Sequence, residues 1–244
     1  MPDNPITWGV LPDGVLDRIV VFSPHFDDAA LGTAHLLGAH PDALVVTVMG
    51  GPPPSYPDPP TEWDALGGFR AGDDVVALRR EEDRAAMKVL EARYEWLEFV
   101  DYQYLATEER ATTETIASEF TRVIDAEQPT AVFLPMGLAN PDHDVTHRAC
   151  MLARDRLGER MAWWCYEDMG YKHIPGMLAW RVSSLFRRGV WPTPVCPPTS
   201  TDEARKRAAI ACYPTQMLAL EDDWAIGAKL AAPAPEQFWR LALD

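Results

Sequence analysis

Residues 18–32 read RIVVFSPHFDDAALG, and this stretch decides the fold class of the 244-residue chain. The apolar run over residues 18–23 is typical of a strand that is covered on both faces. Residues 29–39 (AALGTAHLLGA) predict a helix, so a short polar turn joins strand to helix. A buried strand that leads into a helix is the repeating unit of parallel α/β sheets.

The same alternation continues along the chain. Further strands are expected at 43–49, 94–100, 130–135 and 161–166, and further helices at 74–92, 113–127, 144–157 and 202–212. This order predicts a Rossmann-like, three-layer α/β fold with a mostly parallel central sheet.

Some segments lack such a pattern. The loop over residues 50–72 has PPPSYPDPP at its centre, where prolines oppose regular structure, so it is expected to be a lid or a binding loop. Residues 167–200 show no clear periodicity, and a short tail is expected after residue 212. Since no segment has the composition of a linker, residues 1–244 are expected to form a single domain.

Composition excludes several classes of protein. The chain has 47% apolar residues, enough for a core, and 22 basic against 37 acidic side chains give it a net charge of −15, which opposes binding to nucleic acid. No apolar run approaches the roughly 20 residues that span a membrane. The first residues, MPDNP, lack the features of a signal peptide, so a cytoplasmic protein without membrane contact is expected. The four cysteines form no CxxC pair and are expected to be reduced thiols.

Two polar clusters follow predicted strands. The first contains His25, Asp27 and Asp28, and the second runs from Asn140 to His147. Ligands bind at the carboxyl ends of the strands in open α/β sheets, and imidazole and carboxylate groups suit zinc or another divalent metal. His25, Asp28 and His143 are therefore the candidate metal ligands. Asp27 would remain free to accept a proton from a water molecule.

Other interpretations of these residues are open. Asp27 and Asp28 could be a helix N-cap and its neighbour, since Asp is favoured at helix starts. His147 lies one helical turn after His143 and could face the same ion or the substrate. Aromatic residues in the flanking loops could stack on a sugar or pack beneath the loops: Tyr56, Trp63, Phe69, Tyr171, Trp180 and Trp191. No glycine-rich turn follows Ser23, which disfavours nucleotide binding.

The two clusters resemble the motifs of the LmbE-like, or PIG-L-like, N-deacetylases of the GlcNAc-PI de-N-acetylase family. The family pattern Pro-His-Pro-Asp-Asp-Glu corresponds to PHFDDA at residues 24–29, and His-x-Asp-His corresponds to NPDH at residues 140–143. Weaker matches follow the same order: Arg79-x-x-Glu82, Asp101, YEDMGY at residues 166–171 and YPTQ at residues 213–216. The likeness spans roughly residues 18–217.

The resemblance implies a zinc-dependent hydrolase that removes the acetyl group from an N-acetylated amino sugar. Mapped onto the motifs, His25, Asp28 and His143 would bind the metal, and Asp27 would be the general base and then the acid. Asp142 would orient a histidine. Arg79 would lie near the substrate, although it could equally pair with Glu82 or Asp83 on the helix surface, and Tyr171 would contact the substrate.

Two departures from the family pattern stand out. Asn140 occupies the place of a histidine that is a candidate hydrogen-bond donor to the oxyanion, and an amide can donate but carries no positive charge. His147 is the candidate to compensate. Ala29 replaces the glutamate after the aspartate pair.

The expected function is removal of an N-acyl group from an amino sugar or from a glycosylated natural product, as in antibiotic biosynthesis. Two alternatives remain. One is an amidase for a thiol-sugar conjugate or another N-acyl amide, and the other is a non-catalytic sugar- or metal-binding protein, which only Asn140 favours. The expected partner is a small N-acetylated glycoside. The resemblance also allows a homo-oligomer, although no residue indicates an interface.

Overall fold

A computed structural model describes residues 11–158, 160–231 and 236–243, so the first residues used above for localisation lie outside it. Its centre is a seven-stranded sheet in the order β3-β2-β1-β4-β5-β7-β6. The strands are β1 (Ile19–Ser23), β2 (Leu44–Thr47), β3 (Arg93–Trp96), β4 (Ala131–Pro135), β5 (Ala162–Tyr166), β6 (Val190–Pro194) and β7 (Phe238–Leu243). Strands β1 to β5 are parallel, and β7 pairs antiparallel with both β5 and β6. The predicted mostly parallel α/β fold is confirmed.

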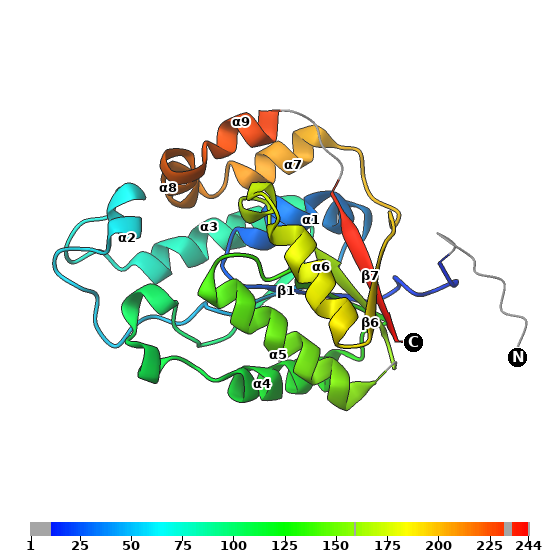
Figure 1. Ribbon diagram of the computed structural model, residues 1–244. Coiled ribbons are helices and arrows are strands. Elements are labelled where there is room, and N and C mark those ends of the chain that lie inside the picture. Colours follow the sequence, from blue (N-terminus) through cyan, green and yellow to red (C-terminus); the bar gives the residue numbers. More distant parts are fainter. Residues whose placement is uncertain (1–10, 159, 232–235, 244) are drawn as a thin grey trace, which may run out of the picture.

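Helices cover both faces of the sheet (Figure 1). They are α1 (Asp28–Ala39), α2 (Glu62–Leu66), α3 (Val75–Leu90), α4 (Thr113–Glu127), α5 (Pro141–Leu157), α6 (Met177–Arg187), α7 (Glu203–Ile210), α8 (Pro214–Trp224) and α9 (Ile226–Ala231). Short 3-10 helices span Tyr102–Tyr104, Thr107–Glu109 and Tyr171–His173.

Alternate side chains of the central strands pack into two separate hydrophobic cores, one on each face of the sheet. In β1, Val20 and Phe22 pack with α4, α5 and α6 on one face. Ile19 and Val21 pack with α1, α3 and α7 on the other. Because both faces are covered, the central strands are mostly apolar, and every residue of β1 and β4 is buried.

The position of β1 fixes where a site can form. It pairs with β2 on one side, where Val20 lies opposite Leu44, and with β4 on the other, where Ile19 lies opposite Ala131. The chain therefore forms β2 and β3 on one side of β1 and then crosses over to form β4 on the other side. The loops after β1 and β4 diverge at such a switch point and leave a crevice at the carboxyl edge of the sheet.

The structure corrects several sequence-based expectations. The region without periodicity contains α6 and β6, and the expected tail contains α8, α9 and β7. Strand β6 (VWPTP) carries two prolines, which suggest a loop locally but are tolerated on the edge strand of a sheet. The proline-rich loop includes the short helix α2.

The helix expected at 144–157 begins earlier, at Pro141. His143 is therefore in its first turn rather than in a preceding loop. No helix in the described part of the chain is long and apolar enough to cross a membrane.

Candidate metal centre and active site

The turn after β1 is organised by Ser23. Its hydroxyl donates to the carbonyl of His25 at 2.6 Å and accepts the N–H of Ala29 at 2.9 Å. Ser23 thus satisfies a backbone donor at the start of α1. Asp27 holds the N-cap position of that helix but makes no capping bond with its side chain. Asp27 therefore has the N-cap position that the alternative interpretation gave it, but its carboxylate makes no capping bond and is not engaged in holding the helix start.

The turn after β4 is organised by Asn140 and by proline. Asn140 is the N-cap of α5, and its Oδ1 accepts the N–H of Asp142 at 2.8 Å. Pro141 occupies the first helical position, where its missing N–H costs nothing. The helix therefore starts early enough to place Asp142 and His143 in its first turn, at the edge of the sheet.

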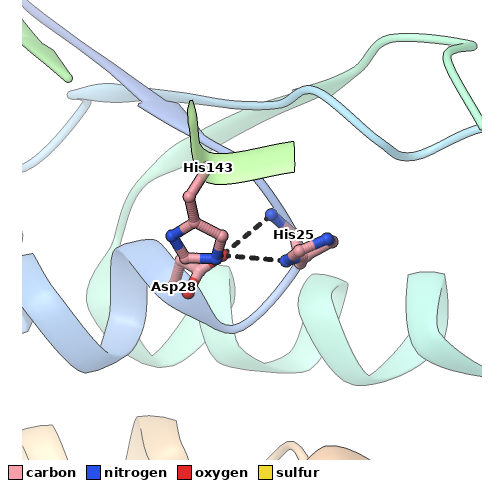
Figure 2. Close-up of side chains that lie close together, drawn as sticks. All are labelled: His25, Asp28 and His143. Atoms are coloured by element: carbon pink, nitrogen blue, oxygen red, sulfur yellow. Dashed lines mark hydrogen bonds and ion pairs between the residues drawn. The ribbon is translucent and has the colours of Figure 1, made fainter. Parts of the chain in front are cut away.

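The two turns meet. Oδ2 of Asp28 lies 3.3 Å from Nδ1 of His25 and 3.2 Å from Nε2 of His143. Figure 2 shows the three side chains close together, with dashed lines that join Asp28 to His25. His25 and Asp28 come from the first turn and His143 from α5, so segments more than 100 residues apart in sequence supply one group of ligand atoms.

Each of these histidines has a second carboxylate behind it. Nδ1 of His143 lies 2.6 Å from Oδ1 of Asp168, and Nε2 of His25 lies 3.1 Å from Oδ2 of Asp142. With a metal bound, these carboxylates would hold a proton on the far nitrogen of each ring, and the nitrogen that faces Asp28 would bind the ion with its lone pair. Asp142 therefore lies where the resemblance implied. The role of Asp168 was not anticipated, although it stands within the YEDMGY match.

Asp101 lies on the far side of His25. His25, Asp101 and Asp142 also bring ligand atoms close together, but the nearest oxygen of Asp101 is 3.9 Å from His25 Nε2. Oδ2 of Asp142 already accepts from His25 and from the N–H of Tyr102 at 3.1 Å. These bonds fit carboxylates that orient the ring better than a second set of metal ligands.

The charges around the three residues show what the site favours. Burial alone would lower the pKa of His143, but Asp28 and Asp168 raise it to about 9. Burial likewise opposes charge on His25, and Asp142 and Asp28 nevertheless raise its pKa well above the usual value. Burial would raise the pKa of Asp28, yet the two imidazoles hold it well below its usual range. The pocket therefore concentrates negative charge around two imidazoles, an environment that favours a bound cation.

The donor set itself fits a divalent metal. Two imidazole nitrogens and one carboxylate oxygen lie within 4.8 Å of one another, which is compatible with a common ion that each would contact at about 2 Å. Three protein ligands leave a coordination position for water or substrate, as in catalytic zinc sites. His25, Asp28 and His143 are the residues that would hold the ion.

Asp27 is set apart from the ligands. It is 7% exposed, and burial together with the charge of Asp28 raises its pKa to about 7. A carboxyl group with a pKa near neutrality can both accept and return a proton at working pH.

A cavity of about 440 Å³ opens beside these residues. His25, Asp27, Asp28 and His143 form its polar wall. The apolar and aromatic part of its lining includes Leu31, Trp63, Met169, Leu220, Trp224 and Ile226. Several of these side chains pack together as a small cluster contributed by α1, α2, α8 and α9, and by the loop after β5.

Arg79 and Tyr171 both line the cavity. Arg79 is 5% exposed, and its guanidinium pairs with Asp64 at 3.1 Å and lies over the ring of Phe69. The alternative of a surface ion pair with Glu82 or Asp83 is therefore wrong. Tyr171 packs edge to face against His143, with ring centroids 5.1 Å apart.

Several other candidates lie elsewhere. His147 is fully buried, and its Nδ1 donates to the carbonyl of Pro135 at 2.9 Å. Burial and the charge of Arg181 lower the pKa of His147 to about 3. It does not line the cavity, so the structure does not support a role for it in place of Asn140. Among the loop aromatics, Trp180 and Trp191 are exposed outside the cavity.

Comparison with known proteins agrees with this geometry. Residues 20–154, more than half of the chain, match the family model described as PIG-L: GlcNAc-PI de-N-acetylase. No protein of curated function matches the sequence significantly. This match confirms the predicted family and the predicted enzyme class, that of the amide-cleaving deacetylases.

Solved structures extend the similarity beyond the family match. The crystal structure of the A40926 pseudoaglycone deacetylase Dbv21 has 25% sequence identity and a TM-score of 0.76 and covers 93% of this chain and 98% of its own. A deacetylase of the teicoplanin biosynthesis pathway has 22% identity and a TM-score of 0.76 over the same shares. GalB, a 4-carboxy-2-hydroxymuconate hydratase of Pseudomonas putida KT2440, has 18% sequence identity and a TM-score of 0.54, and the match covers 93% of this chain and 97% of the GalB chain. Because this hydratase shares the fold, the fold alone does not determine the reaction. On the family match and the two motifs that meet at the sheet edge, the chain belongs to the PIG-L family of de-N-acetylases.

Proposed function

We propose that this protein is a metal-dependent N-deacetylase that acts on an amino sugar of a glycosylated natural product. One observation carries the proposal. The three candidate ligands and the carboxylate of Asp27 line the same cavity as a group of aromatic and apolar side chains. The polar residues suit amide hydrolysis, and the aromatic and apolar residues suit the C–H face of a sugar and the apolar part of a larger aglycone.

The metal we infer is zinc, held by His25, Asp28 and His143. When bound, such an ion polarises the amide carbonyl and lowers the pKa of water. A related teicoplanin deacetylase has been solved in a zinc-inhibited form, which makes the identity of the metal an experimental question here. Asp142 and Asp168 would keep the two imidazoles in the orientation that ligation needs.

Asp27 is the general base of the proposed reaction. It would accept a proton from the attacking water and later donate that proton to the nitrogen of the leaving amine. Its raised pKa and its lack of a capping bond both support this role. A general base contributes on the order of 10²- to 10⁴-fold to a rate.

The substrate class follows from the similarity and from the cavity. Two solved structures with TM-scores of 0.76 that cover 93% of the chain are deacetylases of the A40926 pseudoaglycone and of the teicoplanin pathway. Trp63 and Trp224 line the same cavity as the ligands and supply aromatic surface on which a sugar ring can stack. We infer that the N-acyl group lies toward His143 and the aglycone toward α8 and α9.

We also propose that the chain acts as one catalytic domain in the cytoplasm. Residues that line the cavity extend from His25 to Ile226, so the site needs most of the chain. The four cysteines are free thiols, as expected in a reducing compartment.

The test combines metal analysis with acetate release. Purified protein is loaded with zinc, cobalt or manganese and incubated with N-acetyl amino sugars, N-acyl glycopeptides and thiol-sugar conjugates. We expect acetate or fatty acid to be released from the glycosides, with one metal bound per chain. Asp27→Asn should reduce turnover at least 100-fold and keep the metal, whereas Asp125→Asn, an exposed residue of α4, should change neither.

Other results would overturn the proposal. Turnover confined to thiol-sugar conjugates would favour the alternative amidase. Sugar binding without hydrolysis by any metal-loaded form would favour a binding protein. Full activity of Asp27→Asn would refute the assignment of the base.

A further inference from the structure

Tyr171 lines the cavity, and the proposed reaction has not yet used its hydroxyl group. Its ring is fixed between two other rings, edge to face against His143 at 5.1 Å and against Trp224 at 5.1 Å. Its hydroxyl lies beside Asn140, whose Nδ2 donates to it at 3.3 Å. The hydroxyl therefore sits at the ligand side of the cavity and not at its apolar side.

The direction of this hydrogen bond is fixed by Asn140. Oδ1 of Asn140 accepts the N–H of Asp142 as the helix cap, so the side-chain amide cannot turn over without losing the cap. Its Nδ2 consequently faces the tyrosine oxygen. A single amide thus links the start of α5, which carries His143, to Tyr171.

The proton of the Tyr171 hydroxyl has no acceptor among the described residues. A phenol hydroxyl can donate one proton and can also accept a hydrogen bond, and in the bond with Asn140 it acts only as the acceptor. The proton therefore remains available to a group that enters the cavity. A hydroxyl that is held in place with its proton unused is the arrangement expected of an oxyanion donor.

We propose that Tyr171 donates a hydrogen bond to the oxygen of the scissile amide as negative charge develops on it, and that Asn140 is the positioning residue that holds Tyr171 in place. The inference rests on the proposed deacetylase function. It assigns to Tyr171 the role that the sequence suggested for Asn140 or His147. The proton stays on the phenol throughout, and no bond to Tyr171 forms or breaks.

The surroundings of Tyr171 support this role. Its ring is held by His143 and Trp224 and its oxygen by Asn140, so both ends of the side chain are fixed. Asn140 lacks the charge of the family's histidine, and a neutral phenol oriented by a neutral amide supplies the missing donor without adding a cation beside the metal ligands.

Three substitutions separate this proposal from its alternatives. Tyr171→Phe keeps the ring between His143 and Trp224 and removes only the hydroxyl, and we expect kcat to fall about 10²- to 10³-fold with little change in KM. Asn140→Ser keeps a capping oxygen and leaves the tyrosine proton free, so we expect a loss of tenfold or less. Asn140→Asp also keeps the cap, but its second oxygen would accept the tyrosine proton, so we expect a loss as large as that of Tyr171→Phe.

A binding measurement gives a readout independent of turnover. The probe is an N-acetyl amino sugar in which the acetyl group is replaced by a methylphosphonyl group, which presents a tetrahedral, negatively charged centre. Calorimetry on the zinc-loaded proteins should show that Tyr171→Phe weakens this probe by the same factor as kcat, whereas its affinity for the product amino sugar and its metal content stay unchanged. The double variant Tyr171→Phe/Asn140→Asp should be no worse than either single variant, because both remove the same bond.

Each contrary outcome has a distinct meaning. If Asn140→Ser loses as much as Tyr171→Phe and the losses add, Asn140 itself contacts the oxyanion and the proposal is overturned. Equal binding of the phosphonyl probe to wild type and Tyr171→Phe also overturns it. Absence of acetate release from every substrate by the wild type refutes the proposed function, and the probe still tests Tyr171 in that case.

Discussion

Asp168 is expected to determine how tightly the chain binds its metal. It is almost fully buried, and its two oxygens have different partners. Oδ1 lies 2.6 Å from Nδ1 of His143, and Oδ2 accepts the N–H of Leu138 at 3.1 Å. The substitution Asp168→Asn changes one atom and removes the charge, so it tests this pair of bonds without a change of shape.

The magnitude follows from the two partners, which are both donors. An asparagine can accept one of these bonds, but its amide group would then point at the other donor. If the amide faces His143, Nδ1 must give up its proton and Nε2 must take it, which opposes metal ligation. Loss of such a carboxylate behind a metal-bound histidine typically lowers metal affinity 10- to 100-fold. We therefore expect Asp168→Asn to weaken zinc binding by about 1.4 to 2.7 kcal/mol.

The assay is a titration of zinc against a chelator of known affinity, with urea unfolding of the metal-free proteins alongside. Glu167→Gln is the matched control, because this adjacent acid is also buried but accepts from Trp239 and pairs with Lys172 instead of touching a ligand. It should bind zinc as the wild type does. Equal zinc affinity of Asp168→Asn and wild type, or an equal loss in Glu167→Gln, would refute the reasoning.

Three further predictions concern stability and substrate size. Burial raises the pKa of the Asp83 carboxyl group from 3.8 to about 6, so the folded state binds its proton more tightly than the unfolded state does. Protonation of Asp83 therefore stabilises the fold at low pH, and this stabilisation is lost as the pH rises from about 4 to 6. Asp83→Asn should remove about 3 kcal/mol of this pH dependence in urea unfolding, and an unchanged pH profile would contradict this. Gly137 has φ +75°, and a Cβ there would lie 2.9 Å from the carbonyl oxygen of His143. Gly137→Ala should therefore lower both the free energy of unfolding and the affinity for zinc. Gly189 has φ +74° with open space around it, so the control variant Gly189→Ala should lower the free energy of unfolding by only about 1 kcal/mol and leave zinc binding intact. Trp224→Ala should raise KM for a glycopeptide substrate more than for a free N-acetyl sugar, with metal content unchanged; an equal effect on both substrates would show that the aglycone lies elsewhere.

The parallel part of the fold was predictable because its signals are local. A strand such as β1, buried on both faces, is apolar up to its last residue, and the helix that follows it is rich in small and apolar residues. The antiparallel strands gave no comparable signal. Strand β7 depends on partners far away in sequence, and its neighbour β6 contains prolines that locally indicate a loop.

The candidate site divides in the same way. The clusters around His25 and His143 were visible because polar residues directly follow buried strands, and the adjacency of β1 and β4 brings those clusters together. Asp168 was not singled out, because its importance lies in one 2.6 Å contact with His143 that no spacing predicts. The position of His147 could not be judged either. His147 lies one turn after His143 on α5, and at that position its side chain is buried in the core and does not reach the cavity.

The sequence by itself determined the residue types available for chemistry, the alternation of strand and helix, and the family pattern, because each of these depends on neighbouring residues. Only the tertiary structure decided which nitrogen of each imidazole faces Asp28, which carboxylates orient them, and that the hydroxyl of Tyr171 lies beside Asn140. Hydrogen-bond direction and burial depend on groups brought together from distant parts of the chain, and the amino-acid order alone does not specify their distances.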